Sequence, residues 1–298
     1  MNKIIIHEVG PRDGLQAEKT VVPTETKLEW LRALLNTGLD IVQVGSFVRG
    51  DKMPQMADTD ELFRVLSKEP HAAILSGLVL NEKGLERGME CGVELFCMGV
   101  SASETHSQKN TGMSTIEAQG RIIAMAKSAM GAGKKVQVSV QSAFGCGFEG
   151  RIHEERVLGV VGAYLDAGLR NISLADTAGH GYPEQVKRLF SEIFKRAPDA
   201  QCTCHFHDTY GLGMANIYAA MDVGVTSFET SFAGLGGCPF TKVAAGNVAT
   251  EDLVHGLRRA GLRTEIDLGA LIGVARNVTA FFGRDMTGRV HKTAPLAY

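Results

Sequence analysis

The sequence lacks the features that would mark a membrane protein, a nucleic-acid-binding protein or a protein held together by disulfides. No apolar run approaches the ~20 residues of a membrane-spanning helix, and a net charge of -2 offers no general attraction for nucleic acid or an anionic membrane. Six cysteines, irregularly spaced along 298 residues, favour reduced thiols over a disulfide framework. The apolar run at the N-terminus is too short for a secretory signal, and an acidic residue, Glu8, follows it closely. We therefore expect a cytoplasmic protein that binds a small molecule, with no nucleic-acid or membrane partner.

The chain also lacks a low-complexity linker, and no Gly-x-Gly-x-x-Gly motif follows its first strand-like run. The second absence disfavours a doubly wound open sheet that binds a dinucleotide. Short β-rich runs instead alternate with amphipathic helical segments, and eight strands are predicted, at residues 4–9, 41–44, 74–78, 95–99, 136–140, 172–175, 202–207 and 227–231. This alternation predicts an α/β fold in which a parallel sheet closes into a (β/α)8 TIM barrel.

The pattern predicts one domain over residues 1–298, with the barrel in about 1–262 and a helical extension in about 263–298. Capping and stop signals predict helices near 23–38, 59–67, 81–91, 114–131, 154–167, 182–193, 213–223, 250–260 and 268–282. The last helix follows the eighth strand and its helix, so we expect it to pack across one end of the barrel or to form a dimer contact.

Reactive groups of a TIM barrel lie at the carboxyl ends of its strands. Polar residues gather at these positions in the sequence, although little that is polar follows the third strand. In chain order they are Arg12 and Asp13, Gln43 and Ser46, Ser101 and Glu104, Gln141 and Ser142, Asp176, His205 and His207, and the loop that carries Cys238.

His205 and His207 form the most informative pair, because residues i and i+2 of a strand point to the same face. Two convergent imidazoles suit a divalent metal ion, although two hydrogen-bonded histidines lining the barrel remain an alternative. The same alternation puts Cys202 and Cys204 on the opposite face, which argues against a thiolate site.

Asp13 follows the first strand and would add a hard oxygen ligand to the two histidines. A mixed set of oxygen and nitrogen ligands fits Mg²⁺ or Mn²⁺ better than structural zinc. Arg12 would then stand beside the metal, where a permanent cation can neutralise a developing oxyanion. A surface turn with a solvated ion pair is the alternative. Asn247 is a possible fourth ligand through its amide oxygen, or a loop asparagine near a helix start.

A glycine-rich loop at 234–240 carries Cys238. Glycine lets a backbone take conformations that a Cβ forbids, which is useful where a chain passes close over a ligand. A thiol on such a loop is either a reactive group on a lid or a small apolar residue without a chemical role.

Several stretches resemble the 3-hydroxy-3-methylglutaryl-CoA lyase family, and place the chain among the metal-dependent aldolase-like barrels that include the isopropylmalate and homocitrate synthases. In chain order they are EVGPRDGLQ at 8–16, SFV at 46–48, PQMAD at 54–58, HFHDTYG at 205–211, AGLGGCP at 233–239 and GNVATED at 246–252.

The resemblance implies that Asp13, His205, His207 and Asn247 bind Mg²⁺ or Mn²⁺. It also implies that Arg12 stabilises an enolate, that Cys238 donates a proton from a mobile loop, and that Asp13 or His205 removes the substrate's hydroxyl proton. The implied reaction cleaves a 3-hydroxyacyl-CoA to acetyl-CoA and a keto acid, as in leucine degradation, in a homodimer or higher oligomer. The residues expected to contact the substrate are Gln16, Gln43, Ser46, Ser142 and Asp176.

The sequence departs from the family's pattern at Gln43, where the lyases usually carry glutamate, at Ala175 and Ala178, and after Cys146, where a proline is missing. These changes alter the walls of the site, so the substrate can be another 3-hydroxyacyl-CoA. Asp176 is expected to orient a ligand or to cap a turn of the barrel.

Two other functions compete with this interpretation. A Claisen-type synthase is disfavoured because the chain ends soon after the barrel and because the residues around Cys238 match the lyases. Gln43 leaves open a metal-binding paralogue without lyase activity. Basic groups for the CoA moiety are Arg49, Lys52 and Lys109, each equally an ordinary surface charge.

Overall fold

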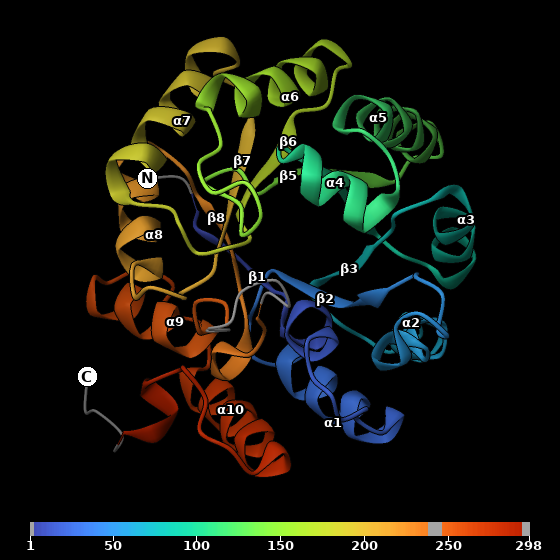
Figure 1. Cartoon of the computed structure of the whole chain (residues 1–298). Coiled ribbons are helices and arrows are strands. Elements are labelled where there is room, and N and C mark those ends of the chain that lie inside the picture. Colours follow the sequence, from blue (N-terminus) through green and yellow to red (C-terminus); the bar gives the residue numbers. More distant parts are fainter. Residues whose placement is uncertain (1–2, 238–245, 294–298) are drawn as a thin grey trace.

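The eight predicted strands form a closed parallel barrel (Figure 1). The structure, a computed structural model, describes residues 3–237 and 246–293. Neighbouring strands pair in chain order, and the barrel closes where Ile5 of the first strand lies opposite Ser227 of the last. The strands are β1 (Ile5–Glu8), β2 (Ile41–Ser46), β3 (Ile74–Leu78), β4 (Leu95–Ser101), β5 (Lys135–Gln141), β6 (Asn171–Asp176), β7 (Gln201–Phe206) and β8 (Ser227–Thr230). The predicted TIM barrel is confirmed.

The predicted helices are also present, and most of them form a ring around the barrel (Figure 1). Local signals set their ends: the Ser114 hydroxyl and the Glu117 carboxylate form a capping box at the start of α5. These helices are α1 (Thr24–Leu35), α2 (Thr59–Leu66), α3 (Glu82–Cys91), α5 (Thr115–Gly131), α6 (Glu154–Asp166), α7 (Pro183–Arg196), α8 (Gly213–Asp222), α9 (Thr250–Arg259) and α10 (Leu268–Phe282).

One further helix, α4 (Glu104–Thr111), was not predicted. All of its residues are polar, so the sequence shows no apolar stripe of helical period at this place. Its capping groups hold it instead, because the Ser103 hydroxyl accepts the amide of His106 and Gly112 ends the helix at a φ of 73°. His106 and Asn110 of this helix line the cavity described below.

Strand alternation places apolar side chains between the barrel and the helices. Cys202 and Cys204 lie in this core, at 4% and 1% exposure, together with Phe206 and Phe228. Burial raises the pKa of the Cys202 thiol to about 12, so it is an uncharged packing group. The prediction that these two cysteines lie away from the histidine face is confirmed.

The last helix, α10, packs against α1, α9 and the short turn η3 (Phe232–Gly234) that follows β8. Its buried side chains include Leu271, Val274 and Val278. Trp30 of α1 stacks edge to face on both Phe281 and Phe232, at 5.5 and 6.1 Å between ring centroids. The apolar face of α10 is therefore used within the chain, beside the ring of helices rather than across the barrel.

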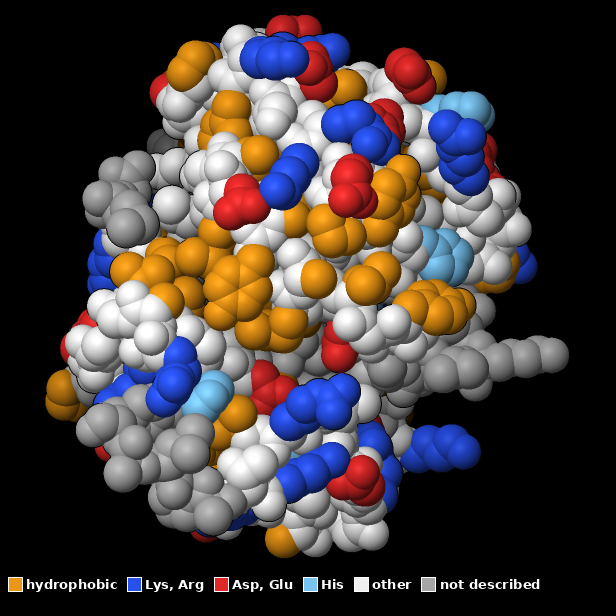
Figure 2. All heavy atoms as spheres, turned by 90° about the vertical axis from the view of Figure 1, so that its left-hand side faces the viewer, with side chains coloured by type: hydrophobic (Ala, Val, Ile, Leu, Met, Phe, Trp, Pro, Cys, Tyr) orange, Lys and Arg blue, Asp and Glu red, His pale blue; other side chains and the backbone are white. Residues whose placement is uncertain are grey.

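The surface seen in Figure 2 carries a band of apolar side chains between charged groups, on the side of the molecule that holds α7 and α8. Large exposed apolar side chains in or next to these helices are Tyr182, Tyr210, Leu212 and Tyr218. Across 3–237 and 246–293, no helix combines the length and the apolar character needed to cross a membrane.

Candidate active site

A cavity of about 330 Å³ opens at the carboxyl ends of the strands. It is lined by most of the residues that the strand-end pattern selected, and also by apolar side chains of β3 and β4. Its predicted members are Arg12, Asp13, Gln16, Gln43, Ser46, Gln141, His205 and His207. A larger hollow of about 1100 Å³ lies at the amino ends of the strands and contains none of the predicted site residues. The smaller cavity is therefore the candidate active site.

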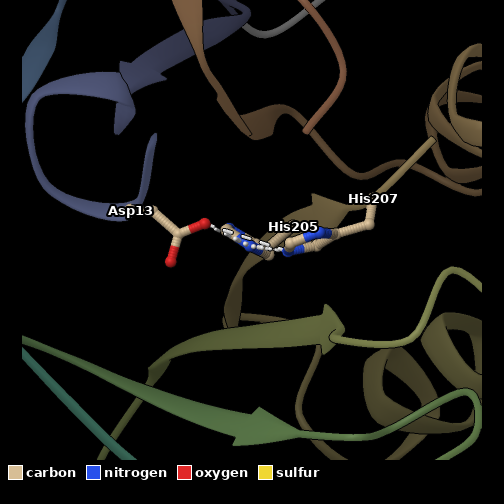
Figure 3. A group of neighbouring side chains, drawn as sticks. All are labelled: Asp13, His205 and His207. Carbon is tan, nitrogen blue, oxygen red and sulfur yellow. Dashed lines mark hydrogen bonds and ion pairs between the residues drawn. The ribbon is translucent and has the colours of Figure 1, made fainter. Parts of the chain in front are cut away.

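Asp13, His205 and His207 converge in this cavity (Figure 3). Asp13 comes from the π-helical turn η1 (Gly10–Gly14) after β1, His205 from β7, and His207 from the chain directly after β7. Oδ2 of Asp13 lies 3.7 Å from Nε2 of His205 and 3.8 Å from Nε2 of His207, and the two Nε2 atoms are 3.1 Å apart. One ion can contact all three atoms.

Glu229 of β8 fixes the orientation of His205. Its Oε2 lies 2.8 Å from Nδ1 of His205, which leaves Nε2 to face the cavity. Burial alone would lower the pKa of His205, but the hydrogen bond that its Nδ1 donates to Glu229 and the charge of Asp13 raise this pKa above its usual value. Because only Nε2 faces the cavity, His205 can act as a metal ligand or as a proton acceptor, but not as both at once.

Arg12 determines the charge state of Asp13. Its Nη1 donates to Oδ1 of Asp13 at 2.7 Å, and Gln16 donates to the same oxygen at 3.2 Å. Burial would raise the pKa of the Asp13 carboxyl, but Arg12 and the two histidines hold it well below its usual range. Asp13 is therefore a carboxylate, with Oδ1 engaged by donors and Oδ2 directed at the histidines.

Asn247, in the segment between β8 and α9, lies next to the triad of Asp13, His205 and His207. Its Nδ2 donates to Oδ2 of Asp13 at 2.9 Å and to the carbonyl of Leu235 at 3.2 Å. Its Oδ1 is buried and has no hydrogen-bond partner among the residues that the structure describes. A buried amide oxygen without a partner is costly, and the lone pairs of Oδ1 are available to a cation while Nδ2 keeps its bonds to Asp13 and Leu235. The donor set of one carboxylate, two imidazoles and one amide oxygen thus fits a divalent cation such as Mg²⁺ or Mn²⁺.

The guanidinium of Arg12 is held on two sides. Its Nε donates to Oε1 of Gln43 at 2.5 Å, and its Nη1 is bound to Asp13. Its Nη2 makes no hydrogen bond within residues 3–237 and 246–293, and Arg12 lines the cavity. A rigidly held cation with a spare donor can stabilise an oxyanion without rearrangement.

Two of the predicted substrate contacts lie outside the cavity lining. The Asp176 carboxylate accepts the backbone amides of His180 and Gly181, each at 2.9 Å, so it caps the turn between β6 and α7. Burial raises its pKa to about 7. Ser142 is also buried, at a positive φ of 54° where the chain turns after β5. Both residues shape turns at the rim. Cys238 lies outside the described residues, although the preceding Gly237 lines the cavity.

Sequence reasoning missed the buried carboxylates that support the site. Glu229 could have been found, because a glutamate in the middle of a barrel strand has no apolar role, and it pairs in register with His205. Glu8 of β1 accepts the backbone amides of Gly10 at 2.7 Å and Phe232 at 3.0 Å, and the Thr250 hydroxyl at 2.6 Å. It thereby fixes the start of η1, which carries Arg12 and Asp13. Nothing in the sequence indicates this role.

Comparison with known proteins gives the family of the chain. A protein-family model described as HMGL-like matches residues 3–278. The chain belongs to the HMGL-like family. Among relatives of this HMGL-like chain, the hydroxymethylglutaryl-CoA lyase YngG of Bacillus subtilis is 35% identical over 287 residues, covering 96% of each chain. The (R)-citramalyl-CoA lyase of Chloroflexus aurantiacus is 36% identical, covering 99% of this chain and 96% of its own.

A solved structure gives the same result. The HMG-CoA lyase from Acinetobacter baumannii in complex with coenzyme A and 3-methylmalate has a TM-score of 0.90 and 37% identity, covering 99% of this chain and 98% of its own. This HMGL-like protein is therefore a carbon–carbon lyase, which agrees with the family expected from the motifs.

Proposed function

We propose that the protein is a divalent-metal-dependent lyase that cleaves a 3-hydroxyacyl-CoA similar to 3-hydroxy-3-methylglutaryl-CoA into acetyl-CoA and a keto acid. One observation carries the proposal: Asp13, His205 and His207 converge beside Arg12 in a cavity at the carboxyl ends of the barrel strands. The activities named for the relatives, and the coenzyme A in the A. baumannii complex, support a CoA thioester as substrate.

The cation would be held by Oδ2 of Asp13, Nε2 of His207, the amide oxygen of Asn247 and, when it is not accepting a proton, Nε2 of His205. When bound, Mg²⁺ or Mn²⁺ supplies Lewis-acid polarisation of the substrate's oxygen atoms. The protein's own side chains transfer the protons and stabilise the enolate.

The proposed reaction begins with loss of the substrate's hydroxyl proton to His205 or Asp13, the two acceptors at the histidine face. The electron pair that the O–H bond leaves on oxygen forms the second C–O bond of the keto group, and the bond between the carbinol carbon and the carbon next to the thioester breaks. That electron pair becomes the enolate of acetyl-CoA, and Nη2 of Arg12 donates to the enolate oxygen. Protonation of the enolate carbon gives acetyl-CoA, and we propose Cys238 as the donor. Gln16, Gln43 and Ser46 line the same cavity and are the proposed substrate contacts.

Citramalyl-CoA is a second candidate substrate, and Gln43 is the observation that favours it. The neutral amide of Gln43 accepts from Arg12, so it adds no negative charge beside the guanidinium. Citramalyl-CoA carries a carboxylate directly on its carbinol carbon, one methylene closer to the breaking bond than in 3-hydroxy-3-methylglutaryl-CoA. A site with fewer negative groups accommodates that carboxylate better.

Turnover on a panel of thioesters tests the function. The protein is assayed with Mg²⁺ or Mn²⁺ for release of acetyl-CoA from 3-hydroxy-3-methylglutaryl-CoA, citramalyl-CoA and longer 3-alkyl homologues, with the keto acid identified as acetoacetate, pyruvate or a homologue. Condensation of acetyl-CoA with a keto acid as the favoured direction would indicate a synthase. Absence of turnover on every member, with metal and CoA still bound, would indicate a paralogue without lyase activity.

Gln43→Glu is expected to change substrate preference. The added carboxylate next to Arg12 should disfavour the substrate whose own carboxylate is nearer, shifting the ratio of kcat/KM towards 3-hydroxy-3-methylglutaryl-CoA over citramalyl-CoA by at least about tenfold, or about 1.4 kcal/mol. Gln43→Met is the matched control, because it removes the hydrogen bond to Arg12 without adding charge. An unchanged ratio in Gln43→Glu would show that the charge at this position does not select the substrate.

We also propose a homodimer or higher oligomer, for which the apolar side chains near α7 and α8 (Figure 2) offer a candidate contact surface. The cytoplasmic location stays a prediction from the sequence.

A further inference from the structure

The turn η3, directly after β8, has an unusual backbone that its surroundings must hold in place. Ala233 has a φ of 57° and Gly234 a φ of 69°. A left-handed conformation is unfavourable for alanine and persists only where neighbouring groups enforce it. The amide of Phe232 is bound by Glu8 from inside the barrel, but the rest of the turn is held from outside.

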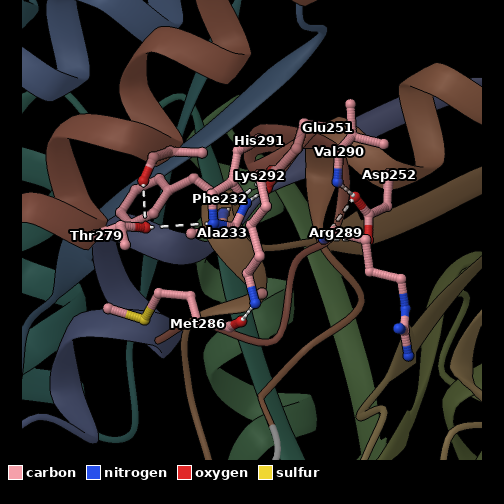
Figure 4. A network of polar contacts seen from close by, with 12 residues as sticks. Phe232, Ala233, Glu251, Asp252, Thr279, Met286, Arg289, Val290, His291 and Lys292 are labelled. Carbon is pink, nitrogen blue, oxygen red and sulfur yellow. Dashed lines mark hydrogen bonds and ion pairs between the residues drawn. The ribbon is translucent and has the colours of Figure 1, made fainter. Parts of the chain in front are cut away.

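The outside contacts come from the last described segment, residues 286–293, which we call the C-terminal clasp (Figure 4). Nδ1 of His291 lies 2.9 Å from Oε1 of Glu251, and Oε2 of Glu251 accepts the amide of Ala233 at 3.1 Å. The Gly288 amide donates to the carbonyl of Ala233 at 2.9 Å, and the Thr287 hydroxyl donates to the carbonyl of Gly234 at 2.8 Å. The clasp thus bonds both residues of the turn that have positive φ.

The clasp is itself firmly attached. The Asp252 carboxylate of α9 accepts the amides of Arg289 and Val290, and Nε of Arg276 in α10 donates to the carbonyl of His291 at 2.8 Å. His291 and Glu251 are buried, at 3% and 0% exposure. The fit is close, because a Cβ at Gly288 would lie 2.6 Å from Oε1 of Glu251 and 2.9 Å from the carbonyl carbon of Ala233.

The turn η3 also holds a proposed metal ligand, Asn247. The carbonyl of Leu235, next to η3, accepts Nδ2 of Asn247, and the same nitrogen donates to Oδ2 of Asp13. A Cβ at Gly236 would lie 2.7 Å from that nitrogen, so backbone and amide are in contact. A shift of the turn must therefore move the Asn247 amide relative to Asp13.

We propose that His291 is a positioning residue, which acts through Glu251 and the backbone of residues 233–235 to hold the Asn247 amide against Asp13 for cation binding. His291 does not line the cavity, so its effect must pass through this chain of hydrogen bonds. The inference rests on the proposed function, in that it assigns Asn247 to the cation.

The test compares the unaltered protein with His291→Phe, which keeps an aromatic ring but removes the imidazole's bonds to Glu251 and Thr279, and with His291→Gln, which can restore a donor. Lys292→Ala is the matched control, because the side-chain bonds of Lys292 go to Met286 and Asp285 rather than to the turn. Three quantities are measured on metal-free protein without substrate: the Kd for Mn²⁺ by calorimetry, hydrogen exchange at the amides of residues 233–235, and the midpoint of denaturant unfolding.

We expect His291→Phe to weaken Mn²⁺ binding by about 10- to 100-fold, the usual loss for groups that support a ligand, and to accelerate exchange at Ala233. His291→Gln should stay within about threefold of the wild type, and Lys292→Ala should match it. Unchanged Mn²⁺ affinity in folded His291→Phe would overturn the proposal, as would equal losses in Lys292→Ala.

If His291→Phe does not fold, Thr287→Val takes its place, because it removes only the hydroxyl that bonds Gly234. Thr287→Val should also weaken Mn²⁺ binding, and an unchanged Mn²⁺ affinity in this variant would overturn the proposal. The proposed function fails separately: the wild type would then bind Mn²⁺ and CoA without turning over any thioester. If only the positioning proposal is wrong, the wild type still turns over a thioester, and the variants keep the Mn²⁺ affinity and amide exchange of the wild type.

Discussion

Arg12→Ala is expected to lower kcat by about 10²- to 10³-fold, equivalent to about 3–4 kcal/mol of lost transition-state stabilisation. The physical reason is that the guanidinium of Arg12 lines the cavity and is held by two bonds, to Gln43 and Asp13, while its Nη2 has no partner among the described residues. A guanidinium held in this way needs no rearrangement when the enolate forms. Since the enolate is absent from the bound substrate, kcat and kcat/KM should fall together.

The same variant should not weaken metal binding. Arg12 places a positive charge next to the Asp13 carboxylate, so its removal reduces repulsion of a cation at Oδ2. Calorimetric titration with Mn²⁺ measures this directly. Arg12→Lys is the matched control: it keeps a positive charge but loses the planar fork that bonds both partners, so an intermediate loss is expected. Near-wild-type kcat in Arg12→Ala would exclude its role in stabilising the enolate.

His207→Ala is expected to abolish activity through loss of the metal. Indirect support of a metal ligand is worth about 10- to 100-fold in affinity, so loss of a ligand should exceed about 100-fold. Nε2 of His207 lies within 4 Å of both Nε2 of His205 and Oδ2 of Asp13. Among the described His, Cys, Asp and Glu side chains, no fourth one joins this group and could take the place of His207. Metal content after gel filtration, measured by elemental analysis, is the readout.

His7→Ala is the matched control for this variant. His7 is another fully buried histidine of the barrel, with Nε2 bonded to the Ser76 hydroxyl at 2.7 Å, and it is outside the triad. Burial lowers its pKa to about 4, so it is a neutral imidazole at pH 7. It should lose stability but keep Mn²⁺ binding. Stoichiometric metal in His207→Ala would show that the ligand assignment is wrong.

The barrel and the convergence of its metal-binding triad could be predicted because both depend on short periodicities. Alternation along β7 predicted that His205 and His207 share a face and that Cys202 and Cys204 do not. The rule that strand ends share one face of a barrel brought in Asp13, more than 190 positions earlier in the sequence. These inferences need no knowledge of side-chain partners.

Other parts of the site could not be predicted because they depend on contacts between distant segments. Asp176 ends a strand, as does Asp13, yet its carboxylate is satisfied by two amides of its own turn. The polar helix α4 has no apolar stripe, so it is visible only from its capping groups. The bonds of Glu8 to η3 and of His291 to Glu251 join residues 224 and 40 positions apart, and no local pattern encodes them.

The seam between β1 and β8 has a consequence for biosynthesis. The bond between Asp13 and Asn247 spans 234 positions and that between Glu8 and Thr250 spans 242, so the metal site forms only when the first and last strands meet. Such long-range contacts form late, after the loop-closure entropy has been overcome. A chain still emerging from the ribosome therefore has no complete cation site, and metal affinity appears together with closure of the barrel.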